Sequence, residues 1–248
     1  MKMKNLQMLF ALVLTSSLLL TGCFIDADDH PFGCWNATGP ITTATLAMPA
    51  FDGIVLAMNA RVEITQGDEQ VVVVEGKSDI LNELDLDVHN GIWTIRTQDC
   101  VRNVDNLTFF ITMPEVHSIR ISGSGNVVST NTLGGDREDL ELDISGSGEL
   151  DLALNVDDID AEISGSGKIF LEGQADRLDL AISGSGDFRG FDLFANTGDI
   201  HISGSGNAEV RVADALKIRI SGSGDVFYKG TPIFDISISG SGSVIDAN

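Results

Sequence analysis

Apolar and polar residues alternate in short runs along most of this chain. Leu140, Leu142 and Ile144 are each separated by one polar residue, and the same spacing returns at residues 216–220. Alternation at period two is typical of a β-strand with one buried face, whereas an amphipathic helix would place its apolar residues three or four positions apart. The pattern therefore predicts an all-β protein whose strands share a core.

One phrase punctuates these strands. Ile-Ser-Gly-Ser-Gly occurs seven times, and successive copies start 23, 19, 19, 20, 18 and 18 residues apart. A near-constant period of this length is typical of stacked structural units. The single longer interval contains residues 130–139, which we interpret as a surface loop inserted into one unit. The copies begin at Ile121, Ile144, Ile163, Ile182, Ile202, Ile220 and Ile238.

These observations predict a parallel β-helix with coils of about 18–20 residues, each built from two or three strands of four or five residues. The right hand is the one that general crossover rules favour. If the phrases align, Glu149, Lys168 and Asp187 become neighbours of alternating charge, about 4.8 Å apart. In the same alignment Asp143 and Glu162 would be like-charged neighbours, a contact that disfavours stacking. Glycine permits a sharp, close bend in each coil. The alternation does not decide whether the adjoining serine hydroxyls face inward or outward.

The first half lacks the phrase but is also strand-like. Apolar or alternating runs predict strands near 54–56, 62–64, 71–74, 92–95 and 107–111. Asn90-Gly91 is a strong signal for a tight hairpin turn between two of them.

The N-terminus has the layout of an export signal. Lys2 and Lys4 precede a largely apolar run at residues 8–20, which is shorter than the roughly 20 residues of a membrane-spanning helix. Leu20-Thr21-Gly22-Cys23 resembles the lipobox of bacterial lipoproteins, in which the peptide is cut before the cysteine and that cysteine receives lipid. We therefore expect a signal peptide at 1–22, a lipid on Cys23 and a tether at 23–40. The residue after Cys23 is Phe24 rather than Asp, which favours the outer membrane. The alternative is an ordinary secretory signal with an incidental cysteine.

Charge and cysteine content narrow the partners. Without residues 1–22 the chain keeps 13 basic and 37 acidic residues, a formal charge of −24. Such a surface disfavours nucleic acid and, without help, anionic glycans. Two thiols remain, Cys34 and Cys100, and an oxidising compartment would allow them to form a disulfide. Two free thiols are the alternative.

Candidate catalytic and metal-binding groups are sparse. A serine nucleophile is a single residue beside a positioned base, whereas Gly-Ser-Gly is repeated in every coil, so we interpret the repeat as structural. His201 could neighbour several hydroxyls, but a surface role is the simpler interpretation. The acidic groups at 26–29 and 157–160 do not follow a calcium-loop pattern and are interpreted as solvated turns. The sequence predicts no catalytic residue, no metal and no cofactor.

Residues 51–245 resemble the head GIN domain family, also called auto-transporter adhesin head domains. The resemblance rests on Phe51-Asp52-Gly53-Ile54, on the segments 62–68, 90–95 and 112–114, and above all on the seven repeated phrases. It implies a right-handed β-helix at 41–248 and an exported protein that is often lipid-anchored. It also implies an adhesive role without known catalytic residues, so no functional residue is carried over.

Two functional hypotheses follow. The first is an interaction module on a lipid anchor that presents a row of serines to a glycan or a surface protein. The second is a carbohydrate-active enzyme, a lyase or hydrolase, because other β-helices cleave uronic-acid polymers; the absence of a basic cluster argues against it. The candidate interaction row consists of Ser122, Ser145, Ser164, Ser183, Ser203, Ser221 and Ser239.

Overall fold

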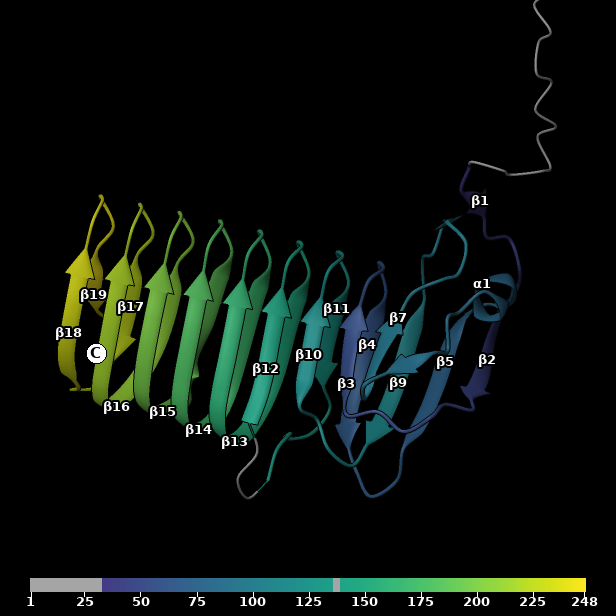
Figure 1. Ribbon diagram of the computed structural model, residues 1–248, viewed down its shortest axis with the longest axis horizontal. Helices are drawn as coiled ribbons and strands as arrows, with labels where there is room; N and C mark the ends of the chain where they lie inside the picture. The colour runs from purple at the N-terminus through teal and green to yellow at the C-terminus, as the bar shows by residue number, and fades with distance from the viewer. Residues whose placement is uncertain (1–32, 136–138) are drawn as a thin grey trace, which may run out of the picture. The chain divides into compact units, whose positions relative to one another are not determined.

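A computed structural model of the protein describes residues 33–135 and 139–248. In the folded unit, Cys34–Asn248, one sheet of 17 strands winds around a common core as a β-solenoid of about seven turns (Figure 1). This confirms the predicted all-β class and the parallel β-helix. The right-handed winding stays a prediction.

The repeated half forms ten strands that pair in parallel, each coil with the next. The repeated isoleucines are in register, so Ile121 pairs with Ile144, Ile144 with Ile163, and so on to Ile238. From Ile121 to Ile220 their side chains form one continuous buried row inside the coils, and Ile238 extends this row into the last coil, where it is 43% exposed. The strands are β10 (Ser118–Ile121), β11 (Asn126–Ser129), β12 (Asp139–Ile144), β13 (Glu149–Ile163), β14 (Lys168–Ile182), β15 (Asp187–Ile202), β16 (Ala208–Ile220), β17 (Val226–Lys229), β18 (Ile233–Ile238) and β19 (Val244–Asp246).

The middle coils differ from the prediction of two or three short strands. Each of β13, β14, β15 and β16 is one strand of 13 to 16 residues that bends around the core. In β13 the in–out alternation resets at Asp157 and Asp158, where two neighbouring residues both lie on the outer side. The coil bends there while pairing with β14 continues on both sides of the bend. The sequence pattern alone predicts that a strand ends where its alternation resets, because the pattern does not show whether hydrogen bonding to the next coil continues there.

Strands in the first half lie where the alternation predicts them, but their stacking order is not the chain order. The coil of β3 (Gly53–Leu56) and β4 (Arg61–Gln66) pairs with β7 and β9 on one side and with β10 and β11 on the other. The chain therefore passes back over its own first coil before the repeats begin. The other strands that this half contributes to the 17-stranded sheet are β2 (Ile41–Leu46), β5 (Val71–Lys77), β6 (Val88–His89), β7 (Ile92–Ile95) and β9 (Thr108–Met113).

The Asn90-Gly91 turn forms as expected. Both residues adopt the left-handed conformation, with φ of 52° and 78°, and they join the antiparallel strands β6 and β7. Two further antiparallel pairs extend the sheet beside the parallel coils: β5 pairs with β9, and β2 pairs with β5.

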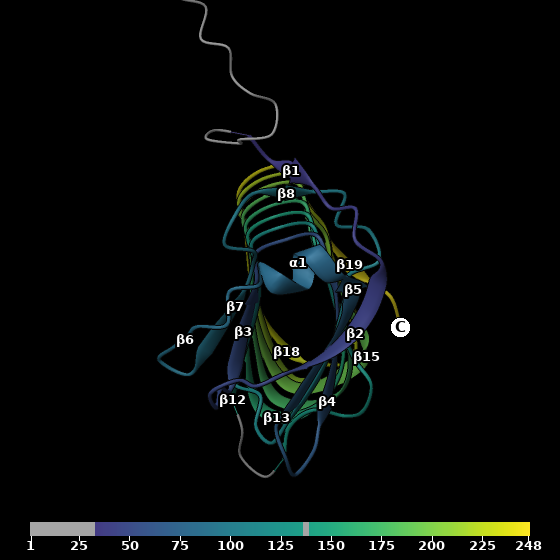
Figure 2. The same ribbon diagram turned by 90° about the vertical axis from the view of Figure 1, so that its right-hand side faces the viewer.

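One end of the solenoid is closed by α1 (Ser78–Asn82), which lies across the interior in the end-on view (Figure 2). Its Ile80 is completely buried. Asp79 fastens the preceding chain by accepting hydrogen bonds from the backbone N–H groups of Thr38 and Gly39, at 2.7 and 2.8 Å. The bond from Thr38 has the largest effect on the pKa of the Asp79 carboxyl and lowers it; burial comes next and raises it, and the bond from Gly39 lowers it further, so that the net shift is downward.

A disulfide joins Cys34 to Cys100 beside this closed end, with 4.5 Å between their Cα atoms. It adjoins a small parallel pairing of β1 (Trp35–Asn36) with β8 (Val101–Arg102). Ala37 is buried, so residues 34–40 pack onto the solenoid although the sequence assigns them to the tether. Cys23 and the expected signal peptide lie outside the described residues.

Candidate functional site

The repeated Ser-Gly-Ser-Gly turns line up along one edge of the solenoid (Figure 1). Their backbones continue the inter-coil ladder: the N–H of Ser145 donates to the carbonyl of Ile121 at 3.0 Å, and the N–H of Ser147 donates to that of Gly123 at 3.1 Å. The same two bonds recur at every later coil. The turns are therefore held at strand spacing, about 4.8 Å, instead of moving independently as loops.

The first glycine of the phrase is explained by close approach. A Cβ on Gly184 would lie 2.1 Å from the carbonyl oxygen of Gly165 in the coil below, much closer than side-chain carbons approach. With one exception, Gly240, the glycines of the phrase do not have a positive φ. The repeat thus needs glycine for space between stacked turns, and the left-handed conformation is not the general reason.

Both serines of each phrase point outward and are exposed. The orientation that the sequence left open is decided by the turn backbone, which aims consecutive serines away from the core. We call these two parallel rows the serine ridge. The first row is Ser122, Ser145, Ser164, Ser183, Ser203, Ser221 and Ser239, and the second is Ser124, Ser147, Ser166, Ser185, Ser205, Ser223 and Ser241.

The serine ridge carries hydroxyls at every coil and no charged side chain. Between Ser122 and Ser239 there are six coil intervals, so the first row extends for roughly 29 Å. Most of its hydroxyls make no hydrogen bond within the described chain; Ser223 and Ser241, 3.1 Å apart, are an exception. The ridge therefore offers repeated donors and acceptors to an external partner.

A polar column beside the second row stabilises the edge. The side-chain oxygen of Asn207 accepts from the backbone N–H of Asp225 at 3.0 Å, and Asp225 accepts from that of Ser243 at 2.8 Å. The expected alternation of Glu149, Lys168 and Asp187 is present in register. This column serves the stacking of coils.

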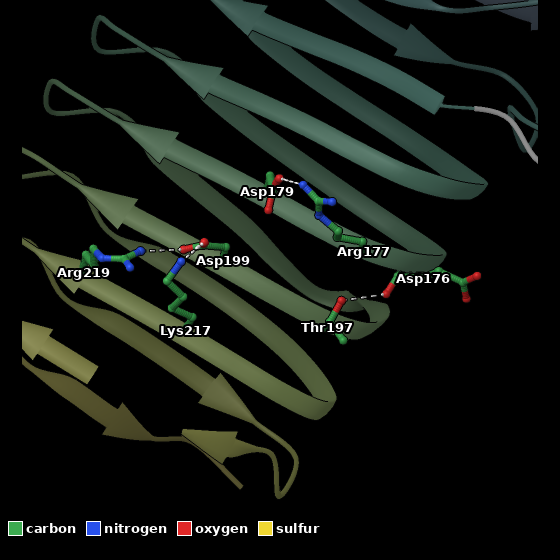
Figure 3. Close-up of polar contacts among 7 residues, drawn as sticks. All are labelled: Asp176, Arg177, Asp179, Thr197, Asp199, Lys217 and Arg219. Carbon is green, nitrogen blue, oxygen red and sulfur yellow. Dashed lines mark hydrogen bonds and ion pairs between the residues drawn. The ribbon is translucent and has the colours of Figure 1, made fainter. Parts of the chain in front are cut away.

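The strand segments that precede the repeated phrase in β12 to β16 form a charged outer face of the solenoid. Figure 3 shows its central part, where Asp199 accepts hydrogen bonds from Lys217 at 2.6 Å and Arg219 at 3.4 Å. On the neighbouring strand β14, Arg177 forms an ion pair with Asp179. All these groups are substantially exposed, so each ion pair stabilises the fold by at most about 1 kcal/mol.

Asp143 is the carboxyl on this face with a raised pKa. Burial is the main cause, Arg120 opposes it, and the nearby Glu141 adds to it. Arg120 itself bonds to both oxygens of Glu141, at 2.6 and 2.7 Å, and not to the in-register Asp143. The like-charged neighbours Asp143 and Glu162 are indeed in register.

A hollow of about 420 Å³ lies on this charged face near the C-terminal end, where Arg177, Lys217 and Phe234 contribute to its lining. Within residues 33–135 and 139–248, no group of three or more His, Cys, Asp or Glu side chains is arranged to hold a metal ion. His201 is exposed on β15 and shares no hydrogen bond with a serine of the described chain. The polar groups here are arranged as repeated rows along the coils.

In the part of the chain that the structure describes, no helix is long and apolar enough to cross a membrane.

Parallel coils stacked around one core define the class of β-solenoid proteins. The chain belongs to one family of that class: the profile described as "Putative auto-transporter adhesin, head GIN domain" matches residues 50–232. The sequence-based resemblance to this family is therefore confirmed. No curated protein matches the chain.

Solved structures share this fold. A putative adhesin from Bacteroides fragilis NCTC 9343 is 22% identical with a TM-score of 0.79, over 85% of this chain and 99% of that one. A putative lipid binding protein from Parabacteroides distasonis ATCC 8503 is 22% identical with a TM-score of 0.71, over 86% and 99%. A putative adhesin from Parabacteroides merdae ATCC 43184 is 18% identical with a TM-score of 0.65, over 87% and 100%. At these identities the likeness shows the fold.

Proposed function

We propose that this protein is a lipid-anchored adhesive scaffold of the bacterial cell envelope, which binds a glycan or a surface protein along the serine ridge. The observation that carries the proposal is the ridge itself: two exposed hydroxyl rows at a constant spacing, held by backbone hydrogen bonds between coils. Family membership supports an adhesive role.

A repeated surface of this kind suits a repetitive, uncharged partner. Each hydroxyl contact is weak, but once one contact is made the next is effectively intramolecular, so affinity accumulates along the row. The chain carries 37 acidic and 15 basic residues, and their repulsion disfavours anionic polymers. A neutral glycan, or a protein surface rich in hydrogen-bonding groups, therefore fits the ridge best.

Binding can be tested with two triple variants that remove equal numbers of hydroxyls. We expect the adjacent change Ser164→Ala, Ser183→Ala and Ser203→Ala to weaken binding on a glycan array much more than three isolated changes. The isolated set, Ser122→Ala, Ser164→Ala and Ser221→Ala, removes no two neighbouring hydroxyls, so no gap in the row is longer than one coil, whereas the adjacent set opens a gap of three coils at its centre. All five serines are exposed, so neither variant should alter the fold.

Equal losses for the two triple variants would contradict binding along a continuous row. Turnover of a polysaccharide that one single substitution abolishes would instead support a carbohydrate-active enzyme.

Anchoring is tested separately at Cys23. Only a thiol can accept the lipid, so Cys23→Ser should abolish incorporation of a fatty-acid analogue and mislocalise the protein. Cys34→Ser is the matched control, because it also removes a cysteine close to the N-terminus but should keep the label. A label retained by Cys23→Ser would refute the lipid anchor, and recovery of the labelled protein in the inner membrane would refute the outer-membrane assignment.

A further inference from the structure

The two ends of the solenoid are built differently. At the N-terminal end the interior is covered by α1 with its buried Ile80, and the sheet continues into the antiparallel strands β5 and β2 (Figure 2). At the C-terminal end the last coil is formed by β18 and β19, which pair with β16 and β17 on one side only. Among the strand pairings of the described chain, none involves the other edges of β18 and β19.

The core rows continue into this last coil and stop there uncovered. Phe234, Ile236 and Ile238 are in register with Leu216, Ile218 and Ile220 of the coil before. The three residues of the earlier coil are at most 2% exposed, whereas Phe234, Ile236 and Ile238 are 40, 44 and 43% exposed. Core-type residues thus continue into the last coil of the described chain, which no further described coil covers.

Such an end combines two features that favour association. Unpaired N–H and C=O groups on a strand edge are ready to pair with another strand, and an exposed apolar surface marks an interaction site in a soluble protein. Solenoids ordinarily close both ends with a capping unit whose outer face is polar. Here that device is present at one end of the described chain and missing at the other.

We propose that the open C-terminal end pairs with the same end of a second copy, giving a closed tail-to-tail dimer. A two-fold axis across the solenoid would place the free strand edges antiparallel, a pairing that each edge can make with its counterpart. It would also bring the apolar rows of the two copies face to face. The other end cannot serve as the partner surface, because α1 and the antiparallel strands cover the core there.

The ring shape of the open end favours a second copy over an unrelated partner. The free strand edges, the turn and the exposed apolar residues all belong to the last coil. Only another layer of the same outline covers all three together. Residues 231–248 form this layer, 18 residues in all, and a standard interface uses about 20–30 residues on each side. With Tyr228 and Lys229 beside it, the open end approaches the size that a specific dimer needs.

Charge does not oppose this contact strongly. Only Asp235 and Asp246 carry charged side chains in the last coil. Asp235 is in register with Lys217 on the outer face, away from the core rows. Asp246 already accepts hydrogen bonds from the side-chain and backbone nitrogens of Asn248, at 2.6 and 3.0 Å.

The dimer also deepens the adhesive role, in a step that rests on the proposed lipid anchor. The disulfide holds Cys34 at the closed end, so the folded unit begins there, and the open end lies at the far end of this unit. Two copies anchored in facing membranes could then join through their distal ends.

Association is tested by sedimentation of the chain from residue 23 onward, with Cys23→Ser to remove the lipid, over about 1–200 µM. We expect a reversible monomer–dimer equilibrium, since interfaces of this size give micromolar or tighter affinity. Ile236→Asp should raise the dissociation constant at least about tenfold, because it places a charge at the centre of the apolar row. The matched control Ile41→Asp alters an equally apolar residue, 56% exposed, on β2 and should dimerise as the unchanged chain does.

A monomer at every concentration would overturn the proposal, as would a dimer that Ile236→Asp leaves intact or Ile41→Asp abolishes. Hydrogen exchange of the unchanged chain gives a test independent of any variant: β18 amides should become protected as concentration rises, and unchanged exchange would also overturn it. The serine-ridge triple variant should dimerise normally, so failure of ridge binding and failure of dimerisation are distinguishable.

Discussion

Replacing the first glycine of a middle turn, in Gly184→Ala, should destabilise the solenoid although the new side chain is a single methyl group. The added Cβ would lie 2.1 Å from the carbonyl oxygen of Gly165, and side-chain carbons do not approach closer than about 3.0 Å. The neighbouring atom is backbone, so it cannot turn away as a flexible side chain would. The two turns must separate by roughly 1 Å, the difference between these distances.

The magnitude follows from what that separation disturbs. The bonds from Ser185 N–H to Gly165 and from Ser205 N–H to Gly184, 3.0 and 2.9 Å long, hold the turns together. Losing one or two such bonds costs about 0.5–1.5 kcal/mol each, and crowding a packed site costs about 1–3 kcal/mol. Alanine restricts the unfolded chain and returns about 0.4–1 kcal/mol. The limits of these ranges give a net loss of about 0.5–5.5 kcal/mol in the free energy of unfolding, with a middle value of about 3 kcal/mol.

The same substitution at the first turn provides the control. A Cβ on Gly123 would meet the backbone of Met58 at 3.2 and 3.3 Å, a tight but tolerable contact, because the turn below it lacks the repeated phrase. Gly123→Ala should therefore change the free energy of unfolding by less than about 1 kcal/mol. Urea unfolding of the three chains, followed by circular dichroism, compares them directly, with hydrogen exchange to show which coils open first.

Equal unfolding midpoints for Gly184→Ala and Gly123→Ala would refute the close-approach explanation of the repeat. So would a large loss in Gly123→Ala alone.

Two further predictions concern stability. The disulfide between Cys34 and Cys100 spans 66 positions, so its reduction should lower the free energy of unfolding by about 2–4 kcal/mol, measured by melting with and without reductant; an unchanged melting temperature would contradict this. Because burial raises the pKa of Asp143 above the ordinary 3.8, the folded state holds its proton more tightly and stability falls as pH rises through the raised pKa. Asp143→Asn should therefore stabilise the protein at pH 7 and lose that advantage below about pH 4; an advantage at pH 7 that persists at pH 3 would contradict this.

Much of the architecture is determined by the sequence because its signals are local and repeated. Alternation such as Leu140, Leu142 and Ile144 specifies which residues face the core, and a constant repeat distance specifies that the coils stack. Asn90-Gly91 likewise determines its own hairpin, since both residues tolerate positive φ. Each of these features depends on backbone preferences within a few residues, so no distant contact is needed to infer it.

The orientation of the serine ridge, in contrast, required the tertiary structure. Ser183 precedes a glycine, and Ser185 lies between two. Glycine allows several backbone conformations, some of which would turn the serine hydroxyl inward and others outward. The outward path is selected by hydrogen bonds to the neighbouring coils, which the sequence does not display. Continuous bent strands such as β13 escaped prediction for the same reason, because pairing with the next coil carries the strand through its corner.

Only the tertiary structure decided how the ends are made. The strand β3 pairs with β7 and β10, although many other strand edges would accept it. Its local alternation of apolar and polar residues would be the same with any of these partners. The helix that closes one end is five residues long and is held by packing of Ile80 and by the contacts of Asp79, both at long range along the chain. The exposure of Ile236 at the other end is equally invisible in sequence, because its strand has the same pattern as those beneath it and differs only in that no described coil lies above it.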